Sequence, residues 1–352
     1  MQPLPLQTQT VFAELAERVA ARDAARSVAH LAGSFNRKRV SGRVYWYFKA
    51  SVAGAGQREY YLGADSEPLR HLIEAHRAGR PVEMAEERDL ERLCAMLRGG
   101  GANVVDHAAA RVLQALSSAG VFHLGGVLVG TYAYLVLGNV LGCRWTSGMR
   151  TQDIDIAALA GSLAIAVPPL QADVPSVLDN LGMGFLPVPQ LDPRSPSTSF
   201  KVRGRELRVD FLTPASGRRT ATAVPIPRLK LAATPLEMLD YLIDRPVRTI
   251  AVDSGAVAVN VPEPARFALH KLALAARRPT TAQAKAAKDR EQALEILELL
   301  QEQRPHDIGQ AIRAARARYP SFMTRVQRAV RALPPTPLSR DLQRRLAGTR
   351  PR

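Results

Sequence analysis

The sequence predicts an α+β fold with a short mixed β-sheet at its centre and helices on one side of that sheet. Apolar, strand-like runs at residues 121–129, 153–158 and 207–212 are separated by clusters of glycine and proline. From Pro264 onward, apolar residues recur at helical spacing instead. Hydrophobic residues make up 46% of the 352-residue chain, which is enough to form a sizeable core.

The run Gly99-Gly100-Gly101 is the clearest linker in the chain. We take it as the end of an N-terminal helix and β-hairpin module over residues 1–100. The core is expected over residues 101–262, beginning with a helix over 102–119. A helical region with a basic tail is expected over residues 263–352.

Within the N-terminal module, the apolar spacing predicts a helix over residues 10–30. Residues 43–63 are typical of two strands joined by the Gly54-Ala55-Gly56 turn. Ser66 is expected to begin the next helix, and a second helix is expected over residues 82–98. The module should therefore be a small α/β unit.

Later segments follow the same patterns. Strands are predicted at residues 247–252 and 256–261. Residues 187–198 contain four prolines and are expected to form a loop. The tail from about residue 335 is rich in proline and arginine, and we expect it to be frayed.

The chain is strongly basic, with 48 Lys and Arg against 32 Asp and Glu and a formal net charge of +16. Such a charge favours anionic partners, namely nucleotides, nucleic acid such as RNA or tRNA, or an anionic surface. A solvated, arginine-rich surface is the alternative. The cysteines, Cys94 and Cys143, match neither a disulfide framework nor a zinc pattern, which favours a reducing, cytoplasmic location.

Residues 121–142 carry no formal charge and are long enough to span a bilayer. Five glycines, His123 and Asn139 in this stretch favour a buried strand, a glycine turn and a buried helix instead. The first residues, MQPLPLQTQT, also lack the basic and apolar regions of a secretory signal. We therefore expect no membrane partner.

The run TQDIDIA is the centre of the predicted site. Successive strand side chains point to opposite faces, so Asp153 and Asp155 project together while Ile154 and Ile156 enter the core. Their Cα atoms would be ~6.6–6.8 Å apart. Like charges this close are unfavourable unless a cation lies between them. Carboxylate oxygens suit Mg²⁺ or Mn²⁺.

A third carboxylate, Asp210, lies in the run RVDFL, on a strand expected to neighbour the first. The three acids are predicted to bind metal and to catalyse phosphoryl displacement, with two metal ions ~3.5–4 Å apart clamping the attacking and leaving oxygens. Gly130 would let backbone amides approach a triphosphate at a helix N-terminus. Thr131 would add a hydroxyl hydrogen bond.

The order of these motifs, namely Gly-Thr, a helix, Asp-apolar-Asp-apolar and a later Asp on a strand, resembles the polymerase β-type nucleotidyltransferase superfamily. The runs LVGTYAYLVLGNVLGCRWTSGMRTQDIDIA and PEPARFALHKLALAARRPTTAQAKAAKDREQAL resemble a subfamily of largely uncharacterised bacterial nucleotidyltransferase-fold proteins. The resemblance covers about residues 30–310 and implies a polymerase β-like core that binds an NTP. Thr131 and Asp153 are 22 positions apart, more than is usual in the superfamily, which implies an insertion at 140–150.

The second run also resembles abortive-infection toxin nucleotidyltransferases, in which a helical lysine and a later aspartate complete the site. By position, this resemblance implies that Lys271 contacts triphosphate oxygens. It also implies that Asp289 orients the triphosphate or the acceptor, and that Arg277 and Arg278 add positive charge.

Each motif has a plainer alternative. An isolated Asp-x-Asp often caps a helix or lies in a solvated loop, and Gly130-Thr131 can be a turn with a helix cap. Lys271 can be a surface lysine whose stem packs along a helix, and Asp289 can belong to a surface ion pair. His123 and His270 lie among apolar residues, which favours core or boundary histidines over ligands.

A separate motif lies in the N-terminal module, where Arg37-Lys38-Arg39 precedes Tyr45-Trp46-Tyr47-Phe48 and Tyr60-Tyr61. Basic residues interleaved with aromatic ones can hold phosphates and stack bases. Strand alternation divides these aromatic side chains between two faces, so at least half are expected in a core. Nucleic-acid binding and a structural role both stay open.

The sequence thus predicts an Mg²⁺-dependent enzyme that transfers a nucleoside monophosphate from an NTP to an acceptor hydroxyl and releases pyrophosphate. The acceptor (RNA or tRNA, a protein or a small molecule) is open, as is a role as a toxin or in phage defence. One alternative is a non-catalytic regulator that binds nucleotide or nucleic acid on the same fold. Another is a nuclease that uses the same acids. The oligomeric state is open.

Overall fold

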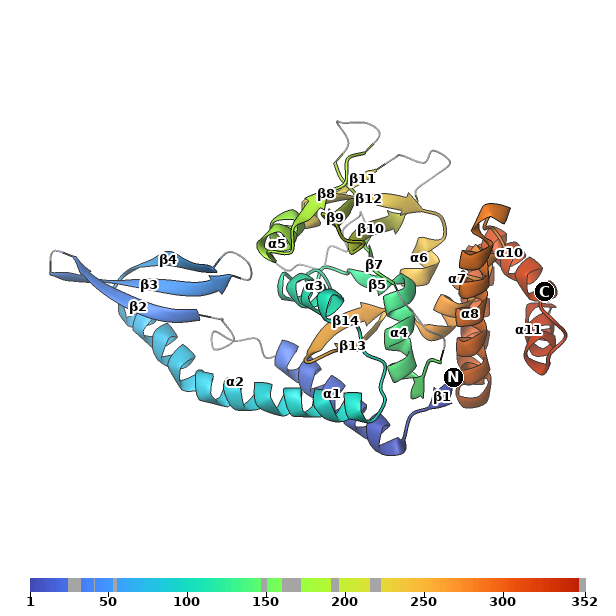
Figure 1. Ribbon diagram of the computed structural model, residues 1–352, viewed down its shortest axis with the longest axis horizontal. Coiled ribbons are helices and arrows are strands. Elements are labelled where there is room, and N and C mark those ends of the chain that lie inside the picture. The colour runs from blue at the N-terminus through green and yellow to red at the C-terminus, as the bar shows by residue number, and fades with distance from the viewer. Residues whose placement is uncertain are drawn as a thin grey trace.

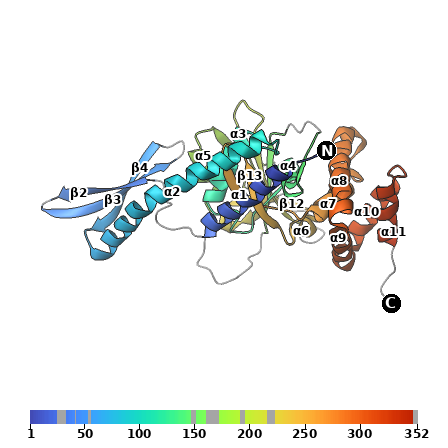
Figure 2. The same ribbon diagram turned by 90° about the horizontal axis from the view of Figure 1, so that it is seen from below.

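The computed structural model describes residues 1–24, 33–40, 42–52, 56–146, 151–159, 172–190, 196–215 and 223–347. Figures 1 and 2 show an elongated molecule. An N-terminal β-sheet lies at one end, a mixed sheet with its helices lies in the middle, and the C-terminal helices lie at the other end.

The middle of the molecule is built on a mixed β-sheet, the central sheet, with strand order β11-β12-β10-β7-β5. In addition, β9 pairs with β10, and β8 pairs with β9, in the same sheet. Its strands are β5 (Val127–Val129), β7 (Asp153–Ala157), β8 (Phe185–Pro187), β9 (Ser199–Val202), β10 (Arg208–Pro214), β11 (Val224–Ile226) and β12 (Leu231–Leu236). Both β7 and β12 pair parallel with β10, whereas β5 pairs antiparallel with β7. The predicted α+β arrangement with a mixed sheet is confirmed.

Strand alternation buries one face of β7 and β10. Ile154, Ile156, Val209 and Phe211 have no exposed surface. They pack into a hydrophobic core that also contains α3 (His107–Ser118) and α4 (Gly130–Val140). The acidic residues between them point to the other face and stay partly exposed.

The predicted strand over residues 121–129 is wrong for its first six residues, because β5 begins only at Val127. Gly120 and Gly125 adopt positive φ angles of 84° and 87°, so the chain turns here, although Val121 and Phe122 are buried. Apolar side chains in this segment mark burial rather than strand. Within the described part of the chain, no helix has the length and hydrophobicity needed to cross a membrane.

The N-terminal module begins with α1 (Leu6–Ala24). It continues with an antiparallel sheet of β2 (Gly33–Val40), β3 (Arg43–Val52) and β4 (Gly56–Ala64), and it ends with α2 (Glu67–Gly99). The two predicted strands are confirmed as β3 and β4, while β2 is an additional strand. The end of the predicted first helix and most of the Gly54-Ala55-Gly56 turn lie outside the described residues.

The two helices predicted at Ser66 and over residues 82–98 form the single helix α2. Glycine and proline at positions 79 and 81 predict a break, but packing at both ends of the helix favours continuity. Near its start, Ile73 is buried, and the ring of His76 lies 5.0 Å from that of Phe35 in β2. Near its end, Leu93 and Leu97 pack with α1.

A hairpin of β13 (Val247–Val252) and β14 (Ala256–Val261) confirms the two strands predicted there. It joins the N-terminal helices to the rest of the molecule, because a second hydrophobic cluster contains Leu15 of α1, Leu97 of α2 and Ile250 of β13. Asp23, at the end of α1, binds Arg248 of the same hairpin, with 2.5 Å between carboxylate and guanidinium.

The C-terminal region is helical, as predicted. Its helices are α7 (Pro264–Ala275), α8 (Gln283–Gln303), α9 (Pro305–Arg318), α10 (Pro320–Arg331) and α11 (Pro337–Ala347). The frayed tail expected from residue 335 is wrong as far as Ala347. Leu338, Leu342 and Leu346 lie one turn apart on α11 and are buried, and this apolar stripe outweighs the Pro- and Arg-rich composition.

The remaining elements are short. They are β1 (Gln2–Pro3), β6 (Cys143–Arg144), α5 (Val174–Asn180), α6 (Leu239–Ile243), and the 3-10 turns η2 (Pro227–Leu229) and η3 (Thr280–Ala282). β1 pairs antiparallel with β6. Strand β6 lies within residues 140–150, where an insertion was expected. Residues 147–150 lie outside the described ranges.

Candidate active site

Three aspartates from two stretches of chain lie together on the central sheet. Asp155 of β7 is directly opposite Asp210 of β10, and Asp153 is opposite Arg208. Paired strands are ~4.8 Å apart, so the carboxylates of Asp155 and Asp210 are neighbours. Asp153 shares their face because it lies two residues from Asp155. The structure thus brings together the acids that the sequence singled out.

The environment of Asp155 is unfavourable for a negative charge. Its pKa is raised to about 7, first by burial and then by the charges of Asp210 and Asp153, while Lys271 and Arg208 act in the opposite direction. Burial and nearby like charges both disfavour ionisation of a carboxyl group. A group that adds positive charge here would therefore stabilise the ionised form.

Gly130 lies against this carboxylate at the start of α4. Its φ is +68°, and a Cβ at this position would lie 2.1 Å from Oδ2 of Asp155 and 3.1 Å from its Cγ. The glycine is required both by its backbone conformation and by the close approach of Asp155. The phosphate role expected for Gly130 therefore coexists with a structural one, and it remains a prediction.

The Gly130→Ala variant is expected to be less stable than Gly125→Ala. Gly125 also has a positive φ, +87°, but a Cβ there meets nothing within 4 Å. Its replacement should lower the free energy of unfolding by about 1–2 kcal/mol, the cost of the left-handed conformation. Gly130→Ala adds a clash with Asp155 and should lower it further. Urea denaturation of both variants measures the difference, and equal losses would contradict the contact.

Asp210 is held by two partners that the sequence analysis did not name. Nε of Arg208 donates to Oδ1 of Asp210 at 2.7 Å, and the Ser199 hydroxyl donates to the same oxygen. Nη2 of Arg208 also donates to the Ser199 hydroxyl at 2.8 Å. Arg208 was recognisable in principle, because an Arg-x-Asp run on a strand puts both side chains on one face. Ser199 was not, because β9 reaches β10 only through the fold.

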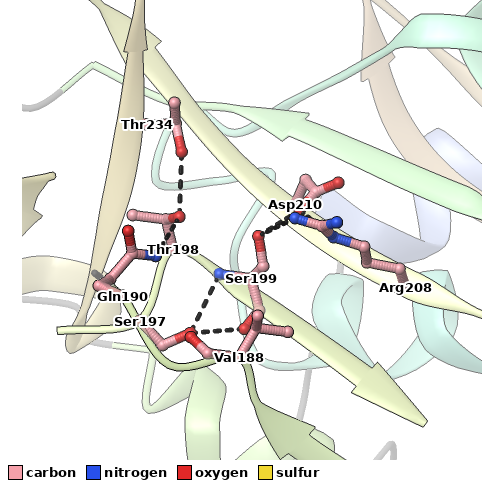
Figure 3. A network of polar contacts seen from close by, with 8 residues as sticks. All are labelled: Val188, Gln190, Ser197, Thr198, Ser199, Arg208, Asp210 and Thr234. Atoms are coloured by element: carbon pink, nitrogen blue, oxygen red, sulfur yellow. Dashed lines mark hydrogen bonds and ion pairs between the residues drawn. The ribbon is translucent and has the colours of Figure 1, made fainter. Parts of the chain in front are cut away.

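Figure 3 shows that this contact continues into a polar network on β9. The Ser197 hydroxyl accepts from the Ser199 amide at 3.2 Å and donates to the Val188 carbonyl at 2.9 Å. Thr198 accepts from the Thr234 hydroxyl of β12 at 3.0 Å. These bonds tie β9 to its surroundings and so hold Ser199 beside Asp210.

A second polar cluster lies between α7 and α8. Lys271 is 8% exposed and Asp289 is 3% exposed, and their charged groups are 2.7 Å apart. The guanidinium of Arg278 binds the other oxygen of Asp289 at 2.6 Å. Lys271 is therefore not a lysine on the helix surface, and Asp289 does not belong to a surface pair.

This cluster faces the carboxylates of the central sheet. The charge of Lys271 lowers the pKa of Asp155 and so opposes burial, Asp210 and Asp153, all of which raise it. The pKa of Lys288 is lowered first by burial and then by Lys271, while the charges of Asp289 and Asp153 raise it. Lys288, which lies one residue before Asp289, was not singled out from the sequence. Lys271 is thus close enough to Asp155, and Lys288 to Asp153, for their charges to act on one another.

Other residues that the sequence singled out lie elsewhere. Arg277 turns outward to Glu237, 2.7 Å away, in an exposed ion pair. His270 is buried, and burial lowers its pKa to about 4, so it is a neutral core histidine. His123 is exposed and lies 3.1 Å from Asp23. His270 is thus a core histidine, whereas His123 is an exposed residue paired with Asp23.

Thr131 lines a cavity of about 620 Å³. None of the three aspartates lines it, although Gln152, the neighbour of Asp153 in the chain, does. Tyr132, which also lines it, donates its phenol hydrogen to the Asp106 carboxylate, and the same hydroxyl lies 3.1 Å from the Thr151 carbonyl oxygen. Burial, then Asp106 and Asp153, raise the pKa of Tyr132, so its phenol stays protonated. Arg205 brings a positive charge to the same cavity. The cavity has both apolar walls and groups that can bind a polar ligand.

The donor set suits a hard divalent cation, because it consists of carboxylate oxygens with no soft ligand. Asp155 and Asp210 are adjacent, and a cation between them would relieve their repulsion. Within the described ranges, no group of three or more His, Cys, Asp or Glu side chains is already arranged to hold a metal ion. Arg208 and Ser199 hold Asp210 here, so metal binding by Asp210 would replace those contacts.

The central and C-terminal parts of the chain match a known family. A family model described as nucleotidyltransferase matches residues 107–317, which include the three aspartates, Gly130 and the α7–α8 cluster. A search of curated proteins finds no match. Because the matched residues make up more than half of the chain, the protein belongs to this nucleotidyltransferase family.

Proposed function

We propose that the protein is a divalent-metal-dependent nucleotidyltransferase with a polymerase β-type core. It transfers a nucleoside monophosphate from an NTP to an acceptor hydroxyl and releases pyrophosphate. The observation that carries the proposal is the pairing of Asp155 with Asp210, with Asp153 on the same face and Lys271 near by. Membership of the family supports an enzyme of the transferase type.

We assign metal binding to Asp153, Asp155 and Asp210. Bound Mg²⁺ or Mn²⁺ would stabilise the negative charge that develops on phosphate oxygens during in-line displacement. The role of Asp210 includes accepting the proton of the attacking hydroxyl. Arg208, released from Asp210, has a guanidinium suited to phosphate oxygens.

We assign triphosphate binding to Gly130, Thr131 and Lys271. The backbone of Gly130 begins α4, whose N-terminus favours anions, and the Thr131 hydroxyl adds a donor. Lys271 supplies an ammonium group whose position is set by Asp289. Because Arg278 holds the other Asp289 oxygen, the lysine has one defined orientation.

Transfer of label from NTPs tests this function. The full-length protein is incubated with Mg²⁺, total RNA and cell lysate, and with each NTP labelled either at the α-phosphorus or at the γ-phosphorus. Nucleotidyl transfer attaches the α-label to an acceptor and releases the γ-label as pyrophosphate. Gel electrophoresis separates labelled RNA from labelled protein, and thin-layer chromatography detects small acceptors.

The alternatives give different outcomes in the same assay. Attachment of the γ-label would indicate phosphoryl transfer and would contradict the proposal. Shortened RNA without attached label would indicate a nuclease. Retention of NTP without any transfer would indicate a regulator. As a control, EDTA should stop the transfer and excess Mn²⁺ should restore it.

A further inference from the structure

The N-terminal sheet of β2, β3 and β4 has two faces with different roles. One face packs on α2. Phe35 and Phe48 have ring centroids 4.9 Å apart, and the ring of His76 from α2 lies 5.0 Å from Phe35. Trp46 is buried and donates from its indole nitrogen to Asp65 at 2.8 Å. This face accounts for the attachment of the sheet to the helix.

The opposite face, which we call the tyrosine face, consists of Tyr45, Tyr47 and Tyr61 with their neighbours. The ring of Tyr61 lies 5.4 Å from that of Tyr47 and 6.2 Å from that of Tyr45. Tyr61 is 60% exposed, and the other two are half-buried. The cluster thus presents one exposed ring flanked by two half-buried rings, and apolar surface that stays exposed in a cluster can mark a binding site.

Basic side chains surround these rings. Nζ of Lys38 lies 4.4 Å from the centroid of the Tyr47 ring and pairs with Glu59. Lys49 is opposite Glu59 on the same face. By strand alternation Arg43 also belongs to this face, which therefore has three cations against one acid and a net charge of +2. The face thus has flat rings for stacking and cations for phosphates.

We propose that the tyrosine face binds single-stranded RNA. Base stacking on aromatic rings needs unpaired bases, and the surrounding cations neutralise the phosphates between them. The phenol groups and the Asn36 amide, opposite Tyr47 on this face, supply hydrogen-bond partners for the 2′-hydroxyl that distinguishes RNA from DNA. In a duplex the bases are stacked on one another and are not free to stack on the tyrosine rings.

Figure 1 shows the sheet of β2, β3 and β4 at one end of the molecule, well apart from β7 and β10, the strands that carry the proposed catalytic acids. RNA binding there therefore does not depend on the transfer reaction, whatever the acceptor. The Asp153→Asn variant, which removes a proposed metal ligand, should bind RNA as the wild type does. Failure of the transfer assay and failure of RNA binding are thus separate results.

Fluorescence anisotropy with the full-length protein and a labelled 12-nucleotide RNA of mixed sequence tests the proposal. Tyr61→Ala should raise Kd about tenfold, the effect of losing one stacked base. Tyr61→Phe keeps the ring and should change Kd by less than about twofold. Lys38→Ala should reduce the slope of log Kd against log salt concentration by about 0.7, the value for one phosphate contact on a single strand.

Control variants distinguish RNA binding by the tyrosine face from general attraction of RNA to the positively charged protein. Arg331→Ala removes one exposed cation from α10 and should leave Kd almost unchanged. Circular dichroism and thermal unfolding confirm that each variant is folded. Unchanged binding by the variant with alanine at positions 45, 47 and 61, or equal weakening by Arg331→Ala, would overturn the proposal. Tighter binding of a duplex, of DNA of the same sequence or of a poly-glutamate peptide would also overturn it.

Discussion

The Asp155→Asn variant is expected to lose nucleotide transfer by roughly 10³-fold or more and yet to unfold at a higher temperature than the wild type without metal. The catalytic loss follows from removal of a proposed metal ligand that stabilises charge in the transition state. The gain in stability follows from the surroundings of Asp155, which is partly buried beside Asp210 and Asp153. A neutral amide of the same shape removes that repulsion.

Label transfer and thermal unfolding, each with and without Mg²⁺, measure both effects. Mg²⁺ should raise the melting temperature of the wild type, because it binds the native state, and should raise that of Asp155→Asn much less. Asp89→Asn is the matched control, since Asp89 forms exposed ion pairs with Arg18 and Arg92. It should alter neither property. Full transfer by Asp155→Asn would remove the assignment of the metal site.

The Lys271→Met variant is expected to have a free energy of unfolding about 3–5 kcal/mol lower than that of the wild type, and to lose nucleotide transfer. The substitution leaves the carboxylate of Asp289 buried without one of its partners, which is strongly destabilising. Adding Asp289→Leu replaces the second charge by an apolar side chain and should restore much of the stability. Arg278, whose side chain is 30% exposed, can then turn to solvent.

Transfer should stay low in the double variant, because the ammonium group assigned to the triphosphate is absent from it. Urea denaturation of the wild type, both single variants and the double variant forms a double-mutant cycle that isolates the pair. The exposed pair of Arg277 and Glu237 is the control, and Arg277→Met should lower stability by less than about 1 kcal/mol. Wild-type transfer by the stable double variant would reduce Lys271 to a structural residue.

Local sequence patterns were sufficient to predict the structure within a single strand or a single helix. The alternation in TQDIDIA correctly predicted that Ile154 and Ile156 are buried and that the aspartates share a face. Helical spacing correctly predicted the helices beyond Pro264. Where composition and spacing disagreed, composition was the weaker guide, as the helix α11 in the Pro- and Arg-rich tail shows.

The sequence by itself determined the acids, the strands that present them and the helices that follow, because strand alternation and helical spacing are local properties of the chain. Only the tertiary structure decided what each acid meets. The pairing of β7 with β10 aligned Asp155 with Asp210 and put Ser199 beside them. The packing of α7 on α8 buried Lys271 with Asp289. Such contacts depend on how distant segments pack, because the free energy that holds them comes from burial shared by the whole core.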